Sequence, residues 1–272
     1  MLIDTHCHLD KNDYDDIEKV IKNMNSNIMI ASAVDLETSL NVVDLCNKYE
    51  NIYGTIGFHP TELDNYNLNS MNEIEKKLNN PKIVGIGEIG LDYHYGKEDE
   101  KLQKEVFIYQ LELARKYKLP VVIHSRDAAL DTINILKEYK DLKIDMHCFS
   151  YSEEIAEELI KMNVKLGIGG VLTFKNSKKL KEIVKKIDLK NILLETDSPY
   201  LTPEPYRGLK NQPSNVKYVA MKIAEIKDLK IEEVEKITSE NAISQFDLKL
   251  KKWYDFNTNE VKKWICIFLK LL

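Results

Sequence analysis

The sequence predicts an α/β fold of a single domain, a (β/α)8 barrel, from three features of its pattern. Short apolar runs alternate with charged stretches of helical period along most of the 272 residues. The runs are apolar on both faces, which is typical of parallel strands covered by helices. Histidines and acidic residues repeatedly follow these runs, and the carboxyl ends of the strands of a closed barrel meet at one rim, where active sites lie.

Short apolar runs bounded by polar segments are predicted as eight strands. They cover residues 2–6, 28–34, 52–57, 83–89, 120–124, 143–147, 164–168 and 191–196. Helices are predicted at 13–24, 36–48, 70–79, 98–117, 127–139, 152–162, 176–187 and 214–227, with a further helix at 231–246 that packs on the barrel. An open doubly wound sheet is the alternative, but it normally carries a glycine-rich phosphate turn after its first strand, where this chain has His6-Cys7-His8.

The absence of a linker rich in proline, glycine or serine predicts one barrel over residues 1–248. Residues 249–272 are rich in lysine, tryptophan and bulky apolar residues, and we expect them to form a separate helical extension. Three interpretations of this extension are open: an amphipathic helix packed on the barrel, a segment that binds a membrane surface or a partner, and a tail with no role in the reaction.

The composition is that of an ordinary globular protein, with 43% hydrophobic and 31% charged residues. A net charge of −5 gives no global basic field, so a polyanionic substrate would need a local basic or metal-lined cleft. The 4 cysteines form no CxxC pair and the first residues show no signal-peptide pattern, which favours a cytoplasmic location. The longest apolar run is too short to span a bilayer, so no stable membrane association is expected.

A histidine pair, His6 and His8, ends the first predicted strand. Because side chains alternate along a strand, residues two apart face the same way. Alone, the pair could equally be two core or solvent-facing histidines. Other predicted strands, however, end in further groups that bind metals, namely Glu88, His124, His147 and Asp197. A shared barrel rim would bring these side chains together, so the sequence predicts a metal centre.

The number of candidate ligands exceeds what one tetrahedral zinc ion needs and suits two divalent cations. We expect Glu88 to bridge them, because a carboxylate has two oxygens and a charge that offsets both cations. One ion would be held by His6, His8, Glu88 and Asp197, and the other by Glu88, His124 and His147. Oxygen and nitrogen ligands without a thiolate allow Mg, Mn or Zn.

Further side chains at the same rim are candidates for catalysis or substrate binding. Besides Glu88, we expect Asp197 and His59 to be catalytic. Asp197 could be the base for the attacking water, or it could cap a helix. His59 could contact the substrate phosphate or leaving group, or it could stabilise a loop. Arg126 could hold a phosphate or pair with the neighbouring Asp127. Arg207, in the loop after Asp197, is a weaker candidate of the same kind.

Asp92 follows the fourth predicted strand closely. It could orient a ligand histidine, or it could cap a turn.

These residues lie in segments that together resemble the TatD family of metal-dependent hydrolases, within the larger amidohydrolase-like group of barrels. The matching segments run in order from residue 3 to about residue 246 and are IDTHCHLD, GTIGFHP, VGIGEIGLDYH, PVVIHSRDA, MHCFS, GIGGVLTFKN, LLETDSPYL, RGLKNQPSNV and ITSENA. The set is specific, although no single segment would be.

The resemblance implies a dinuclear site on a TIM barrel, with metal-binding histidines at His6, His8, His124 and His147 and metal-binding acids at Glu88 and Asp197. It implies a deoxyribonuclease that cleaves phosphodiester bonds with a metal-activated water, often as a 3′–5′ exonuclease on single strands. DNA is then the expected partner of a monomeric enzyme. Some relatives resemble D-aminoacyl-tRNA deacylases, so tRNA, or hydrolysis of another ester or amide by the same site, is the alternative.

The chain departs from the family pattern in two places. Tyr151 follows Ser150 where many members carry glycine or an acidic residue, and it could stack on a base or alter which substrate fits. The extension after residue 248 is the other departure, because many members stop there.

Overall fold

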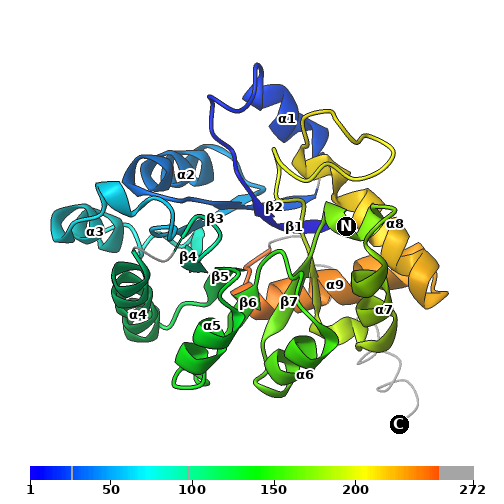
Figure 1. Ribbon diagram of the computed structural model, residues 1–272. Coiled ribbons are helices and arrows are strands. Elements are labelled where there is room, and N and C mark those ends of the chain that lie inside the picture. Colours follow the sequence, from blue (N-terminus) through cyan, green and yellow to red (C-terminus); the bar gives the residue numbers. More distant parts are fainter. Residues whose placement is uncertain (26, 97–98, 251–272) are drawn as a thin grey trace, which may run out of the picture.

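The computed structural model describes residues 1–25, 27–96 and 99–250 and shows an eight-stranded parallel barrel surrounded by helices (Figure 1). The strands are β1 (Ile3–Cys7), β2 (Ile28–Ser32), β3 (Ile52–Ile56), β4 (Ile83–Asp92), β5 (Val121–Arg126), β6 (Ile144–Met146), β7 (Lys165–Ile168) and β8 (Ile192–Leu194). Each strand pairs in parallel with the next along the chain. The predicted (β/α)8 barrel is therefore confirmed.

The helices alternate with the strands and cover the outside of the barrel (Figure 1). They are α1 (Ile17–Asn23), α2 (Leu36–Lys48), α3 (Leu68–Glu75), α4 (Glu100–Tyr117), α5 (Ala129–Leu136), α6 (Glu153–Lys161), α7 (Lys178–Lys186), α8 (Val216–Lys227) and α9 (Ile231–Phe246). Several begin at a polar cap: Asp35, for example, accepts a hydrogen bond from the Thr38 N–H, which satisfies a free donor at the start of α2.

The barrel closes between its first and last strands, just beyond the end of β8. A parallel bridge joins Cys7 to Ser198, and the His8 N–H donates to the Ser198 carbonyl at 2.7 Å. Below it, the Asp4 carboxyl accepts hydrogen bonds from the Thr196 hydroxyl at 2.6 Å and from the Thr196 N–H at 2.9 Å. The closure therefore fixes the segment that carries Asp197 against the strand that carries the histidine pair.

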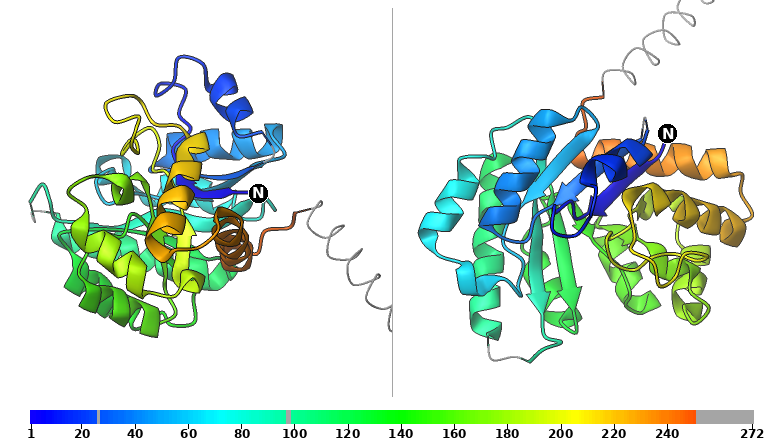
Figure 2. Two further views of the ribbon diagram at one scale, coloured as in Figure 1. Left: turned by 90° about the vertical axis from the view of Figure 1, so that its right-hand side faces the viewer. Right: turned by 90° about the horizontal axis from the view of Figure 1, so that it is seen from above.

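Two apolar cores hold the structure, one outside the barrel wall and one inside it. The outer core lies between the strands and the surrounding helices, and Val234 of α9 is part of it. The inner core fills the amino-terminal end of the barrel with Ile3, Ile28, Ile30, Tyr53, Val84, Val122 and Leu193, together with Ala242, Phe246, Leu248 and Leu250. Helix α9 thus lies across this end and seals it, as the views in Figure 2 show. The opposite end of the barrel is left for polar side chains.

The observed elements differ from the predicted ranges mainly at their ends. Helix α1 begins at Ile17, after the Asp16 cap, and not near residue 13. Strand β4 continues to Asp92, three residues beyond its predicted end, because the β4–β5 ladder runs on as far as Asp92 and Arg126. Strands β6 and β8 are shorter than predicted.

The buried part of the chain continues slightly past residue 248. Leu250 is buried in the inner core, and the Tyr53 hydroxyl donates to the Lys249 carbonyl at 3.2 Å. The rest of the predicted extension, residues 251–272, lies outside the described residues. Within residues 1–25, 27–96 and 99–250, no helix has the length and apolar character needed to cross a membrane.

We predict that Phe246→Ala lowers the free energy of unfolding by about 3–5 kcal/mol, because the ring is fully buried in the seal that α9 forms. Glu240→Ala, an exposed site on the same helix, is the control and should change it by less than about 0.5 kcal/mol. Urea denaturation measures both. Equal stability of the two variants would show that α9 does not seal the barrel.

Candidate metal centre

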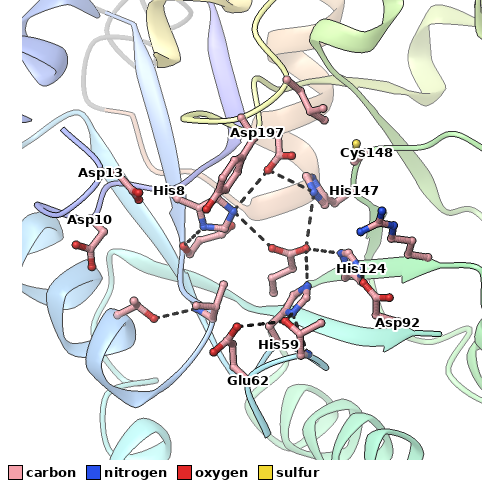
Figure 3. A pocket seen from close by; sticks show the side chains of 18 of the residues that line it. His8, Asp10, Asp13, His59, Glu62, Asp92, His124, His147, Cys148 and Asp197 are labelled. Carbon is pink, nitrogen blue, oxygen red and sulfur yellow. Dashed lines mark hydrogen bonds and ion pairs between the residues drawn. The ribbon is translucent and has the colours of Figure 1, made fainter. Parts of the chain in front are cut away.

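The six predicted ligands meet at the open end of the barrel, where all but the fully buried His6 line a cleft of about 740 Å³. Figure 3 shows His8, His124, His147 and Asp197 pointing toward one another from different strand ends. Donor atoms of His6, His8 and Asp197 lie within 4.8 Å of one another, as do those of His6, Glu88 and His147. The strand ends therefore bring together residues that are far apart in the sequence.

The carboxylate of Glu88 lies between two groups of imidazoles. Its Oε2 is 3.3 Å from Nε2 of His6 and 3.7 Å from Nε2 of His8. Its Oε1 is 2.9 Å from Nδ1 of His124 and 3.7 Å from Nε2 of His147. Asp197 lies near both groups, with Oδ1 3.5 Å from Nε2 of His8 and 3.8 Å from Nε2 of His147. A carboxylate that bridges two cations needs this division of its oxygens.

The histidine pair of β1 is held by the end of β2. Nδ1 of His8 donates to the Ser32 carbonyl at 3.0 Å, and Nδ1 of His6 lies 3.1 Å from the Ser32 hydroxyl. That hydroxyl also contacts Thr55 Oγ1 at 2.8 Å, which fixes its orientation. Both Nε2 atoms are therefore turned to the centre, and such a partner on the outer nitrogen is typical of metal-ligating histidines.

Carboxyl groups hold the other two histidines in the same manner. Nε2 of His124 contacts Asp92 Oδ2 at 2.9 Å, which leaves Nδ1 facing Glu88. Nδ1 of His147 contacts Glu195 Oε2 at 3.1 Å, which leaves Nε2 facing the centre. Asp92 also accepts the His94 N–H at 2.9 Å, so it both orients a histidine and caps a turn.

Glu195 lies at the centre but was not among the site residues predicted from the sequence. It is fully buried, and its second oxygen accepts the Cys148 N–H at 2.8 Å. Space for the carboxyl depends on Gly167, where an added Cβ would lie 2.2 Å from Glu195 Oε2. The available signal was position, since Glu195 lies within the predicted strand 191–196 and two residues before Asp197.

A second glycine allows β4 and β5 to approach closely beside the centre. Gly90 has a φ of +145° and pairs with His124 across the ladder. A Cβ at this position would lie 1.9 Å from the His124 carbonyl oxygen, so only glycine fits. The contact between Glu88 and His124 depends on this close approach.

The electrostatics of the centre favour added positive charge. Burial tends to raise the pKa of Glu88, but the imidazoles of His59, His147 and His6 outweigh it and hold that pKa well below its usual range. Burial tends to lower the pKa of His8 and His124, but neighbouring carboxylates raise both to about 9: Asp197 and Glu88 at His8, and Asp92 and Glu88 at His124. Protons on these imidazoles thus supply charge that divalent cations would supply when bound.

Glu195 has a different charge environment. Burial raises its pKa to about 8, although His6 and the Cys148 N–H favour the ionised form. Added cations at the centre would favour the ionised form further.

His59 also reaches the centre, through its Nε2. The Thr61 N–H donates to its Nδ1 at 3.1 Å, which favours the proton of a neutral ring on Nε2. That nitrogen lies 3.5 Å from Glu88 Oε1. Burial lowers the pKa of His59, so the neutral ring is favoured. With Nε2 protonated the ring can donate to a bound substrate. With the proton on Nδ1, which lies 2.8 Å from Thr61 Oγ1, Nε2 could instead join Glu88 and His124 as a cation ligand.

The remaining predicted residues lie in different surroundings. Arg126 is exposed and lines the cleft. Arg207 is exposed and packs on Phe174, with 3.8 Å between its Cζ and the ring centroid, and it is not among the residues that line the cleft. Tyr151 is half-buried behind the cleft wall, where its hydroxyl lies 2.8 Å from Ser125 Oγ. Of these three side chains, the structure brings only Arg126 to the cleft.

Comparison with known proteins agrees with this arrangement. A sequence model of the family described as "TatD related DNase" matches residues 3–247. The chain belongs to the TatD family. Because the match spans the barrel from β1 to the end of α9, it covers every residue of the centre.

Individual TatD relatives are similar over nearly their whole length. The Bacillus subtilis protein "Uncharacterized metal-dependent hydrolase YabD" is 44% identical over 248 residues, which are 89% of this chain and 97% of the relative. The Escherichia coli K12 protein "Uncharacterized metal-dependent hydrolase YcfH" is 34% identical over 257 residues, 91% of this chain and 96% of the relative. This TatD protein is accordingly a metal-dependent hydrolase.

A solved TatD structure has the same fold. The crystal structure of YJJV, a TatD homologue from E. coli K12, has a TM-score of 0.85 and 28% sequence identity, and the match covers 91% of this chain and 98% of that one.

We predict that Glu195→Gln lowers the affinity of this TatD protein for divalent cations by about 10- to 100-fold. An amide has one accepting oxygen, whereas both oxygens of Glu195 accept hydrogen bonds, so either His147 or the Cys148 N–H loses its partner. Titration with Mn²⁺ against a competing chelator measures the affinity. Asp13→Asn, which changes an acid of the cleft wall, is the control, and equal affinity in both variants would contradict a positioning role.

We also predict that cation binding releases two to three protons at pH 7. His8 and His124, with pKa values of about 9, are protonated without metal and must lose a proton to ligate. Glu195, with a pKa of about 8 without metal, would lose a further proton when the cations favour its ionised form. Proton release should vanish, and the affinity for the cations should become independent of pH, as the pH rises above about 9. Calorimetry in buffers of different ionisation enthalpy measures the protons. His94→Asn, outside the centre, should not alter the count; no release at pH 7 would exclude this ligand assignment.

Proposed function

We propose that this TatD protein is a metal-dependent deoxyribonuclease that hydrolyses phosphodiester bonds at the 3′ ends of single-stranded DNA. The observation that carries the proposal is the division of the Glu88 oxygens between two groups of imidazoles, which suits the two-cation sites of phosphodiester hydrolysis. The description of the family as DNases supports the choice of substrate.

The donor set supports a pair of divalent cations, and we propose the division of ligands that the sequence suggested. The first would be held by His6, His8, Glu88 and Asp197, and the second by Glu88, His124 and His147. Nitrogen and oxygen donors suit Mg, Mn or Zn. When bound, the cations supply an activated water and charge that offsets that of the phosphate oxygens.

Three side chains of the cleft would act on the substrate directly. Burial tends to raise the pKa of Asp197, but the hydrogen bond with His8 outweighs it and lowers that pKa. Asp197 therefore stays ionised and can accept the proton of the attacking water. His59 donates its Nε2 proton to a phosphate oxygen or to the leaving oxygen. Arg126 is the one lysine or arginine that lines the cleft within the described chain, and its guanidinium can bind a phosphate with two hydrogen bonds.

Hydrolysis of D-aminoacyl-tRNA is the second candidate, and one feature of the cleft favours it. The wall beyond the histidines carries Asp10, Asp13 and Glu62 (Figure 3). Carboxylates attract the ammonium group of an aminoacyl ester, whereas they repel the phosphate backbone of a DNA strand that extends along this wall. The same cation pair could then serve attack on a carbonyl carbon.

Location and assembly are part of the proposal. We propose a cytoplasmic monomer, on the basis of cysteines without CxxC pairs and a cleft assembled from a single chain. Cell fractionation tests the location, and analytical ultracentrifugation of the full chain tests the oligomeric state.

We predict that the protein with Mg²⁺ or Mn²⁺ releases mononucleotides from end-labelled single-stranded DNA, and that EDTA stops the reaction. Glu88→Ala should lower the rate at least about 100-fold, because both cations lose a shared anion. Glu37→Ala, an exposed site on α2, is the control and should retain the wild-type rate.

Near-normal turnover by Glu88→Ala would reject the dinuclear assignment. Deacylation of D-aminoacyl-tRNA without any cleavage of DNA would replace the first candidate by the second.

A further inference from the structure

An exposed aromatic ring borders the metal centre in the loop after β8. Tyr200 lines the cleft, yet 58% of its surface is exposed. Its ring packs edge to face with His8, with 6.1 Å between the ring centroids. A tyrosine beside a predicted cation ligand is therefore left open toward the space where a substrate would lie.

The backbone that carries Tyr200 is firmly held. Its N–H donates to the Asp197 carbonyl at 2.8 Å, and its carbonyl accepts from Asn211 Nδ2 at 2.7 Å. Asn211 is fully buried, and the same Nδ2 donates to the Thr196 carbonyl at 3.0 Å. An exposed ring on a fixed backbone is a pre-organised contact surface, because little main-chain freedom is lost when a ligand covers it.

A second exposed ring lies across the cleft. Tyr95 follows β4, which is opposite β8 in a barrel ordered from β1 to β8. Tyr95 lines the cleft with 79% of its surface exposed, and the Arg126 guanidinium lies over its ring, 5.6 Å from the centroid. The two rings therefore come to the cleft from the loops after opposite strands of the barrel.

We propose that Tyr200 and Tyr95 are the stacking surfaces for the two nucleobases on either side of the scissile phosphate. This inference rests on the proposed nuclease function. A phosphate at the centre places its two nucleosides toward opposite walls of the cleft, and each base offers an aromatic face whatever its identity. Arg126 then binds backbone charge beside Tyr95. Binding is tolerant of sequence but needs unpaired bases, since the faces of a paired base are covered by its neighbours in the duplex.

The experiment is a double-mutant cycle between each ring and each base. The holoenzyme is assayed on single-stranded oligonucleotides that carry an abasic residue on the 3′ side or on the 5′ side of the scissile bond. Tyr200→Leu and Tyr95→Leu should each raise KM about 5- to 150-fold on the intact oligonucleotide. For each ring, the increase in KM should disappear on the abasic substrate that lacks the base stacked on that ring. The abasic position that abolishes the increase should differ between Tyr200→Leu and Tyr95→Leu.

Matched variants separate stacking from other roles. Tyr200→Phe and Tyr95→Phe keep the rings and should keep the coupling to the bases. Tyr206→Leu removes an exposed tyrosine from the same loop as Tyr200, but Tyr206 does not line the cleft, so KM should not change. As a readout independent of turnover, fluorescence of 2-aminopurine at the coupled position should be quenched on mixing with wild-type protein and not with the Leu variants.

The outcomes distinguish this inference from the function on which it rests. Equal losses on intact and abasic substrates, or Phe variants as impaired as the Leu variants, would overturn the stacking role while DNA cleavage stands. Failure of the wild-type holoenzyme to bind or cleave any oligonucleotide would remove the proposed function itself.

Discussion

The buried carboxylate of Glu88 is the constraint on which the rest of the site depends. It is 3% exposed and lies within 4 Å of imidazoles from β1, β3, β5 and β6, at distances between 2.9 and 3.7 Å. Such a charge is tolerated in the interior only because the surrounding groups balance it. The barrel is what makes this possible, since it brings the ends of separate strands to one point.

The centre is ordered by partners on the outer side of each imidazole. Hydroxyl, carbonyl and carboxyl groups from other strands occupy one ring nitrogen of each ligand histidine and leave the other facing inward. The tautomers and ring orientations are thereby set by the protein fold. Cations would enter an arrangement that already has its geometry, which limits the conformational entropy lost on binding.

Much of the architecture could be predicted from the sequence because strands buried on both faces appear as continuous apolar runs. The six candidate ligands could be predicted because each lies at or near the end of such a run. The ends of elements were less accurate: β4 runs past its predicted end because Gly90 permits close pairing with β5, a tertiary effect. The surroundings of Tyr151 and Arg207 were equally hidden, since their partners, Ser125 and Phe174, come from other segments.

Glu195 shows which site residues are missed when ligands are predicted only at the ends of strands. It precedes Asp197 by two residues and lies deeper in the barrel, where a carboxyl would be unexpected in an apolar run. Its role depends on His147 and on the space left by Gly167, and both come from elsewhere in the chain.

The seal formed by α9 and the closure at β8 have a consequence for how the chain folds. β1 is synthesised early, but the contact between Asp4 and Thr196 joins residues 192 positions apart, and the helix that fills the base of the barrel follows later still. Until those segments leave the ribosome, one edge of β1 has no partner and the interior is open to water. Closure of the barrel therefore belongs to a late stage of folding, and the nascent protein remains dependent on protection from aggregation until α9 has docked.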